Sequence, residues 1–338
     1  MCDEGGGRRR GGSRPLPHVA REGGVAGMNR VIWVDAEGMS FDNTVAHKLA
    51  RLLDAAESGA DLTDGMRVAL KVNTSEEGYE YGLRPVFLRI PAEEARRVSN
   101  TRPTLCDGLR LVDYWRRVRG NTFMDVARAK GYSTDTLGGN FVINGGFSGD
   151  EGNLYSCGFA ESVLGGVEVG TAVCRSDALW VLSHVTLHPL FGVSGALWNG
   201  GFECLSARAR TRVLDGINPY PFNGARPPAE ALRDFQRRAL ECALAVKVSV
   251  EGKALYVNYL WDVTPQPEYF PFSDKPAAPN LGFLASRDPV ALDAATRDLL
   301  EDCGVDVEGG TGADFKAILQ WAGEIGSGSS EYVLEKLS

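Results

Sequence analysis

Two histidines, His184 and His188, stand at the start of an apolar, glycine-rich stretch. Residues 177–204 read DALWVLSHVTLHPLFGVSGALWNGGFEC and contain no lysine or arginine. The apolar run 178–184 predicts a strand buried on both faces, so that His184 ends the strand and His188 lies in the loop after it. Ligands bind at the ends of parallel strands, so we expect both histidines near a pocket. The plainer interpretation of each is a hydrogen-bonded histidine in polar surroundings.

Histidine suits acid–base catalysis because its unperturbed pKa lies near neutrality. Asp107, at the end of a short strand, and Glu268 are the candidate carboxyl partners. On a helix, the four-residue spacing of His184 and His188 could bind a metal ion. Pro189 restricts the residue before it to extended conformations, which argues against a helix. No metal site is therefore expected. The alternative is a single metal ion that the two histidines bind, with the two acids as further ligands.

A second group of side chains is expected to bind the substrate. Glycines in the stretch either form simple turns or let backbone amides approach a ligand. The candidates offer either a flat apolar surface or a polar group near a strand end, and they are Trp180, Phe191, Trp198, Asn199, Tyr269, Lys71 and Asn73.

Motifs of the common cofactor-binding folds do not occur. No G-x-G-x-x-G follows a strand, there is no P-loop, and GVSGA at 192–196 differs from the G-x-S-x-G turn of α/β-hydrolases. The seven cysteines include no C-x-x-C. An odd, unpatterned set is typical of reduced cytosolic thiols and not of a disulfide framework or a zinc ribbon.

The composition is that of a globular protein, with 338 residues of which 43% are hydrophobic and 24% charged. The net charge of −8 comes from 36 basic and 44 acidic residues. No basic run lies near an aromatic platform, so a nucleic-acid partner is not expected. Residues 177–202 are long enough to span a membrane, but Pro189, Asn199 and the histidines would leave polar groups unsatisfied in lipid. A membrane partner is therefore not expected either.

Residues 1–27 are rich in glycine and arginine and poor in large apolar residues. This predicts a disordered tail without a secretory signal, and hence a cytoplasmic protein. A start of translation at Met28 is the alternative, because codons for residues 22–24 can form a purine-rich, ribosome-binding sequence before it.

Strands and helices alternate from residue 30 onward. Strands are expected at 31–34, 67–72, 104–107, 141–144, 167–173, 178–184, 254–260 and 281–286. Helices are expected from Ser40 or Asp42 to 57, at 84–98 with Pro91 at its start or at a kink, from Asn121 or Thr122 to 130, at 228–246 and at 289–303. This order predicts an α/β fold, a single large domain over 30–303 with a mostly parallel sheet flanked by helices. Residues 304–338 are expected to form a helical extension, with a helix at 312–323.

Two blocks resemble the family called domain of unknown function 362 (DUF362). The first is ALWVLSHVTLHPLFGVSGALWNGG, and the second, at 253–295, is KALYVNYLWDVTPQPEYFPFSDKPAAPNLGFLASRDPVALDAA. Weaker matches are VALKVN at 68–73, PTLCD at 103–107 and NTFMDVARAKGY at 121–132. The resemblance covers essentially all of 30–303, and it implies a scaffold associated with redox chemistry and iron–sulfur clusters.

The chain departs from the family pattern where that chemistry would reside. Pro267 and Tyr269 stand where family members often carry a cysteine pair, and 205–245 has only Cys242 where many have a run of cysteines. The lysines of the family pattern fall at Thr186 or Leu187 and at Trp198, and Asn280 replaces the usual aspartate. An iron–sulfur cluster needs cysteine ligands, so none is expected.

These departures favour an enzyme of bacterial specialised metabolism that needs no cofactor. It would catalyse a redox-neutral cyclisation, isomerisation or dehydration of an apolar, unsaturated small-molecule substrate. One alternative is a metal- or iron–sulfur-associated oxidoreductase of the DUF362 type. Another is a non-catalytic binding protein on a decayed enzyme scaffold. The sequence leaves open whether the protein forms a homodimer.

Overall fold

An eight-stranded sheet forms the centre of the computed structural model, which describes residues 29–111, 116–219 and 226–337. From edge to edge its strands are β12 (Tyr332–Leu337), β1 (Asn29–Val34), β11 (Gly282–Ser286), β10 (Ala254–Leu260), β7 (Ala178–His184), β2 (Val68–Val72), β3 (Thr104–Gly108) and β4 (Asn140–Asn144). The five strands from β10 to β4 are parallel, whereas β11 runs antiparallel to both neighbours. The predicted α/β fold with a mostly parallel sheet is confirmed. The tail expected at 1–27 lies outside the described residues.

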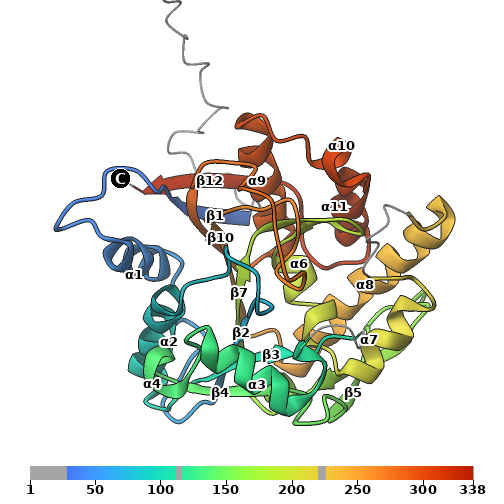
Figure 1. Ribbon diagram of the computed structural model, residues 1–338, viewed down its shortest axis with the longest axis horizontal. Coiled ribbons are helices and arrows are strands. Elements are labelled where there is room, and N and C mark those ends of the chain that lie inside the picture. The colour runs from blue at the N-terminus through green and yellow to red at the C-terminus, as the bar shows by residue number, and fades with distance from the viewer. Residues whose placement is uncertain (1–28, 112–115, 220–225, 338) are drawn as a thin grey trace, which may run out of the picture.

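Helices cover both faces of the sheet (Figure 1). One face packs against α1 (Val45–Ala55), α2 (Pro85–Ser99), α3 (Gly120–Ala129) and α4 (Thr134–Leu137). The other packs against α6 (Ala196–Asn199), α8 (Ala229–Ser249), α9 (Pro289–Asp302) and α11 (Phe315–Glu324). Alternate residues of β7 point to opposite faces, so Leu179 and Val181 join one apolar core and Trp180 and Leu182 the other.

Smaller elements surround the ends of the parallel strands. Two short hairpins pair β5 (Gly152–Ser156) with β6 (Gly166–Gly170), and β8 (Thr186–His188) with β9 (Gly192–Ser194). The strand expected at 167–173 is therefore shorter and lies outside the main sheet. The remaining helices are α5 (Thr171–Cys174), α7 (Ala207–Leu214), α10 (Val307–Thr311) and the 3-10 turns η1 (Arg116–Val118) and η2 (Phe202–Cys204).

Helix α1 begins later than expected, because Thr44 and not Ser40 or Asp42 is its N-cap. The Thr44 hydroxyl accepts from the backbone N–H of His47, and His47 Nδ1 accepts from the backbone N–H of Thr44. This reciprocal capping box satisfies two backbone donors that would otherwise lack partners.

Pro91 neither starts α2 nor ends it, since Pro85 occupies the first turn and Pro91 lies inside the helix. A proline cannot donate to the carbonyl four residues earlier, which here belongs to Phe87. The hydroxyl of Tyr259 on β10 donates to that carbonyl at 3.2 Å. The sheet thus supplies the hydrogen bond that the helix loses.

The C-terminal segment is more than a helical extension. Its helix α11 lies where a helix was expected, but β12 pairs in parallel with β1, from Tyr332 opposite Asn29 to Leu337 opposite Val34. The segment therefore completes the edge of the main sheet. The short strand was missed because its hydrogen bonds come from a partner about 300 residues away, as the Arg30–Glu335 bond across that pair illustrates with a separation of 305.

Candidate functional site

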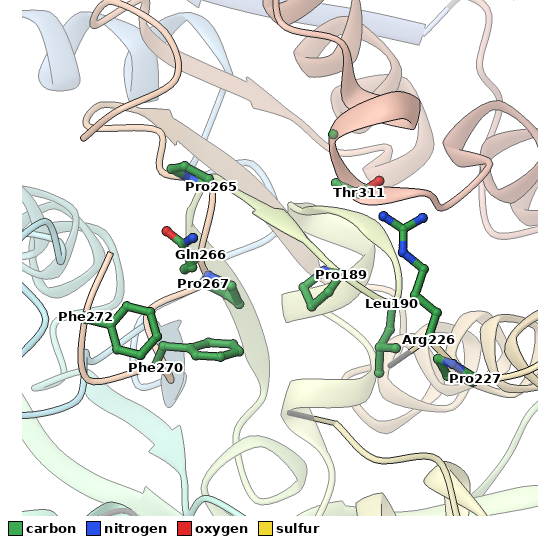
Figure 2. A pocket seen from close by; sticks show the side chains of 11 residues that line it. Pro189, Leu190, Arg226, Pro227, Pro265, Gln266, Pro267, Phe270, Phe272 and Thr311 are labelled. Carbon is green, nitrogen blue, oxygen red and sulfur yellow. The ribbon is translucent and has the colours of Figure 1, made fainter. Parts of the chain in front are cut away.

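A groove of about 400 Å³ lies where the chain leaves the carboxyl ends of β7 and β10. One wall is the loop that follows β10, and the facing wall includes the β8–β9 turn and the start of the segment leading to α8 (Figure 2). Prolines and apolar side chains dominate the lining, which includes Pro189, Leu190, Arg226, Pro265, Pro267 and Phe270. This volume falls within the usual range for small-molecule sites.

A narrower cavity of about 20 Å³ lies next to the groove, with Leu190 lining both. That volume holds about one water molecule. His188, Trp198 and Tyr269 line the cavity, and His188 Nε2 lies 3.1 Å from the Tyr269 hydroxyl oxygen. The rings of His188 and Trp198 are tilted, with centroids 4.2 Å apart. Three of the residues proposed from the sequence therefore meet here.

The hydrogen bonds of His188 define its tautomer. The backbone N–H of Leu190 donates to Nδ1 at 3.2 Å, so the ring proton is on Nε2 and donates to Tyr269. Burial lowers the pKa of His188 to about 3. His188 lies in β8 and not in a loop, because the chain turns at 189–191 and returns as β9.

His184 occupies a different environment from His188. Its Nε2 donates to the carbonyls of Trp261 at 3.1 Å and Asp262 at 3.2 Å, and its ring packs edge-on against Tyr79. Its Nδ1 lies 3.9 Å from Oε2 of Glu268. Burial lowers the pKa of His184 to about 4, despite the opposing effect of the two carbonyls.

Glu268 and Tyr269 are consecutive residues that each approach one histidine. Glu268 lies near His184 and Tyr269 contacts His188. Burial raises the pKa of Glu268 to about 7, although the charge of Arg110 opposes the rise. The guanidinium of Arg110 also lies 5.9 Å from the centroid of the Tyr269 ring. Of the two expected acid partners, only Glu268 is near a histidine.

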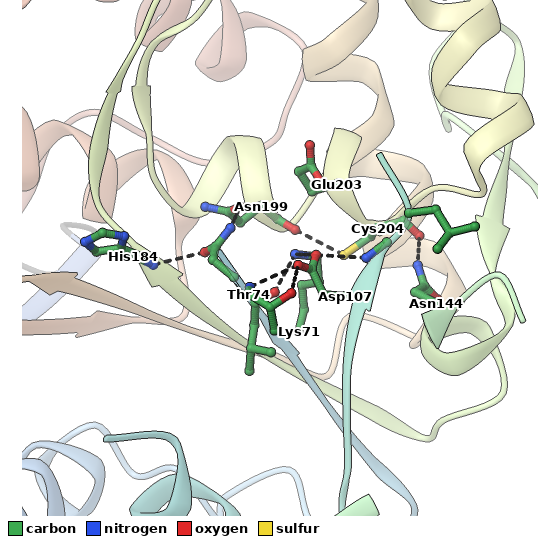
Figure 3. A network of polar contacts seen from close by, with 12 residues as sticks. Lys71, Thr74, Asp107, Asn144, His184, Asn199, Glu203 and Cys204 are labelled. Carbon is green, nitrogen blue, oxygen red and sulfur yellow. Dashed lines mark hydrogen bonds and ion pairs between the residues drawn. The ribbon is translucent and has the colours of Figure 1, made fainter. Parts of the chain in front are cut away.

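Asp107 belongs instead to a buried ion-pair cluster (Figure 3). Its carboxylate pairs with Lys71 at 3.0 Å, Arg110 at 3.1 Å and Arg117 at 2.7 Å. The backbone N–H and the hydroxyl of Thr74 also donate to it. Burial alone would raise the pKa of Asp107, but the three cations hold it well below its ordinary value. Asp107 and Lys71 therefore anchor the ends of β2 and β3, which corrects their expected roles as acid–base partner and substrate contact.

The cluster extends to the cavity through Glu203. Glu203 Oε2 pairs with Arg110 at 3.4 Å and with Arg210 at 3.3 Å, and all three residues line the cavity. None of the three was predicted from the sequence. Arg110 could have been found by its position just after the β3 end, whereas Glu203 and Arg210 had no signal that set them apart from surface charges.

Two asparagines connect the histidine region to the loop that carries Trp198. Asn73 accepts from the backbone N–H of His184 at 3.0 Å and donates to Asn199 at 2.7 Å (Figure 3). Asn199 in turn donates to the carbonyl of Gly195 at 2.9 Å. Both side chains are thus used within the protein, which makes them positioning residues and not free substrate contacts.

Buried Asp293 holds α6, the short helix that carries Trp198. Its two carboxylate oxygens accept from the backbone N–H groups of Ala196 at 2.7 Å and Leu197 at 2.9 Å. A Cβ on Gly195 would collide with this carboxylate, so the close approach requires glycine. Burial raises the pKa of Asp293 to about 6, against the effect of these hydrogen bonds.

Two of the aromatic residues expected to bind the substrate do not line the cavity. Trp180 is in the core cluster on the opposite face of the sheet from Trp198, which corrects its expected place in the pocket. The error arose because a strand apolar on both faces does not reveal which face a given side chain takes. Phe191 is fully buried between Trp198 and Phe315, so it backs the cavity wall without lining the cavity.

Within the described residues, no group of three or more His, Cys, Asp or Glu side chains is placed to hold a metal ion. His184 Nε2 and both ring nitrogens of His188 already make hydrogen bonds. Of the six described cysteines five are buried, and burial raises the pKa of Cys204 to about 12 and that of Cys157 to about 11. The described residues therefore do not fit the cluster that the family resemblance implies.

This α/β domain carries its polar groups at the carboxyl ends of parallel strands, as enzymes and ligand-binding proteins of this class do. Residues 68–298 match the family model for the domain of unknown function DUF362. The chain belongs to that family.

No curated protein matches the chain. Among solved structures, it resembles the lactate racemase apoprotein from Thermoanaerobacterium thermosaccharolyticum, with 16% identity and a TM-score of 0.34 over 62% of this chain and 44% of that one. A protein from Thermotoga maritima matches with 13% identity and a TM-score of 0.38, over 80% of this chain and 60% of that one. The matched region spans less than two thirds of either protein. No helix in the described ranges is long and apolar enough to cross a membrane.

Proposed function

We propose that this protein is an acid–base enzyme that catalyses a redox-neutral isomerisation, cyclisation or dehydration of an organic small molecule. The observation that carries the proposal is the His188–Tyr269 hydrogen bond of 3.1 Å on the wall of a cavity beside a groove of ligand size. Trp198 packs against His188 and forms an apolar wall of the same cavity.

In this proposal Tyr269 exchanges a proton with the substrate and His188 supports it. The Nε2–H of His188 donates to the hydroxyl oxygen of Tyr269, whose own proton points to the carbonyl of Pro219 at 3.4 Å. A substrate oxygen or carbon that replaced that carbonyl as the acceptor would receive the proton. The tyrosinate so formed would then take a proton back from another atom of the substrate, so that Tyr269 ends the reaction as it began. The nearby positive charge of Arg110 stabilises the negative charge that then develops on the Tyr269 oxygen.

His184, which the sequence offered as an acid–base candidate together with His188, has a positioning role in this mechanism. The proton on its Nε2 is donated to two backbone carbonyls. Its ring lies next to Tyr79 and Glu268. No step requires a metal ion or a cluster.

Hydrogen exchange tests this function even while the substrate and product are unidentified. The protein is incubated in D₂O with a metabolite extract of the native cells, and mass spectrometry detects compounds that gain deuterium. An acid–base enzyme labels its substrate at the carbon where a proton is removed and returned. Replacing His188→Gln or Tyr269→Phe should slow the labelling by about 10²–10⁴-fold. His47→Gln on the surface of α1 is the matched control. Full labelling by both site variants would refute the proposal.

The ligand-sized groove, whose lining contains no acid–base pair, favours a second candidate, a non-catalytic binding protein. Retention of a compound from the extract without any labelling would support it. The DUF362-type oxidoreductase is tested separately by metal analysis of protein purified without oxygen. Stoichiometric iron, or a stable brown colour after reconstitution, would replace the redox-neutral proposal.

A further inference from the structure

The groove beside the cavity has the chemistry of a site for an organic acid. We propose that it binds the apolar body of an organic anion and that Arg226 binds its acidic group. This inference rests on the proposed function, since it names the substrate class of the same site.

The lining of the groove is mostly apolar. Four prolines and two phenylalanines contribute to it, and they are Pro189, Pro227, Pro265, Pro267, Phe270 and Phe272. Proline fixes its own φ angle, so walls built from proline lose little conformational freedom when a ligand binds. The side chain of Phe272 is half exposed at the edge of the groove. The surface is thus preformed and apolar, and it is large enough for a ring system or a medium-length acyl chain.

The charge in the groove indicates an anion. Arg226 is the only ionisable side chain among its lining residues, and within the described residues no acidic side chain pairs with it. Its guanidinium extends between Leu190 and Thr311 (Figure 2). Gly312, with a φ of +71°, leaves the room that this group occupies, because a Cβ there would collide with the guanidinium. Arg226 is exposed, so its guanidinium is free to donate two parallel hydrogen bonds to a carboxylate.

The groove adjoins the cavity of the proposed acid–base pair. Leu190 lines both the groove and the cavity, and its backbone N–H donates to His188 Nδ1. Buried Leu190 therefore forms the wall between the two spaces. In this proposal the acidic group and the apolar body of the ligand lie in the groove, and its reacting end lies against Leu190, next to His188 and Tyr269.

Two fluorescent probes with the same aromatic body test the site in the full-length protein. They are 8-anilinonaphthalene-1-sulfonate, which is anionic, and N-phenyl-1-naphthylamine, which is uncharged. Titration should show tighter binding of the anionic probe. Arg226→Gln should lower the affinity for the anionic probe by about three- to tenfold and leave the affinity for the neutral probe unchanged, because only the charge-assisted contact is lost. Arg128→Gln on the exposed face of α3 makes the same change in net charge outside the groove and should alter neither affinity.

A third variant separates the apolar contribution. Phe272→Ser should weaken both probes by a similar factor and keep their affinity ratio. Equal loss of the anionic probe in the Arg226 and Arg128 variants would show a general charge effect and overturn the proposal. Unchanged affinity for both probes in both the Arg226→Gln and the Phe272→Ser variants would do the same, because the probes would then bind elsewhere. These are equilibrium measurements, so their failure is distinguishable from a failure of the deuterium-labelling test of catalysis.

Discussion

Oε2 of Glu268 lies 3.9 Å from Nδ1 of His184, beyond hydrogen-bond distance, and neither atom has a hydrogen-bond partner in the described part of the chain. Both side chains are buried. A buried polar atom without a partner is expensive, and a buried carboxylate more so than a carboxylic acid. Glu268 therefore holds its proton up to about neutral pH, with a pKa raised by burial to about 7.

This proton gives a pH-dependent stability. Between the ordinary value of 4.5 and about pH 7, folded Glu268 is protonated while the unfolded residue is ionised. The free energy of unfolding therefore falls as the pH rises through this window. The glutamine in Glu268→Gln is neutral at every pH, so this decrease does not occur in the variant. Between pH 4.5 and 7, the free energy of unfolding of the variant should therefore rise relative to that of the wild type by up to roughly 3 kcal/mol. Chemical denaturation across this range measures the difference, with the exposed Glu331→Gln as control. A difference that does not change with pH would contradict a raised pKa.

The two histidines impose the opposite slope. Their folded pKa values, about 4 for His184 and about 3 for His188, lie below the ordinary 6.5. The unfolded chain therefore binds protons first as the pH falls below 6.5, which lowers stability. Because Glu268 acts in the other direction, the wild type should show a flatter profile between pH 5 and 6.5 than the Glu268→Gln variant.

The Asp107 cluster predicts a large loss of stability on removal of one charge. Asp107→Asn leaves Lys71 and Arg117 buried without their shared carboxylate, which should lower the free energy of unfolding by about 3–5 kcal/mol. Asp177→Asn, which breaks an exposed pair with Arg67, is the matched control and should cost about 1 kcal/mol or less. Urea denaturation of both variants measures this. Similar small losses would mean that the buried carboxylate does not anchor the strand ends.

Asp293 should position Trp198 through α6. In Asp293→Asn only one of the two acceptor oxygens remains, so one backbone N–H of α6 faces an amide nitrogen. We expect a loss of about 1–3 kcal/mol and a changed near-ultraviolet circular dichroism spectrum as the tryptophan shifts. Asp314→Asn at the N-cap of α11 should change stability by only a few tenths of a kcal/mol, because asparagine caps helices equally well. Equal effects of the two substitutions would argue against a special role for Asp293.

Local patterns were enough to predict most elements of the fold. The continuous apolar run at 178–184 corresponds to β7 and ends at His184, and the run at 254–260 corresponds to β10. Pro289 marked the start of α9. These signals are readable because strand and helix formation depends on residues close together in the chain. The family signature placed the same segments in order, although it did not reveal their contacts.

The sequence by itself determined an α/β protein whose histidines and polar residues gather at strand ends, because hydrophobic period and turn residues are local properties. Only the tertiary structure decided which of those residues meet. Tyr269 contacts His188, which is 81 residues away in the sequence. Asp107 pairs with Lys71, 36 residues away, and with Arg117, 10 residues away, so Asp107 is unavailable to either histidine. Trp180 and Trp198 look alike in sequence, yet they lie in the cores on opposite faces of the sheet. Such choices depend on packing between distant segments, where the best-buried arrangement selects among partners that the local sequence leaves equivalent.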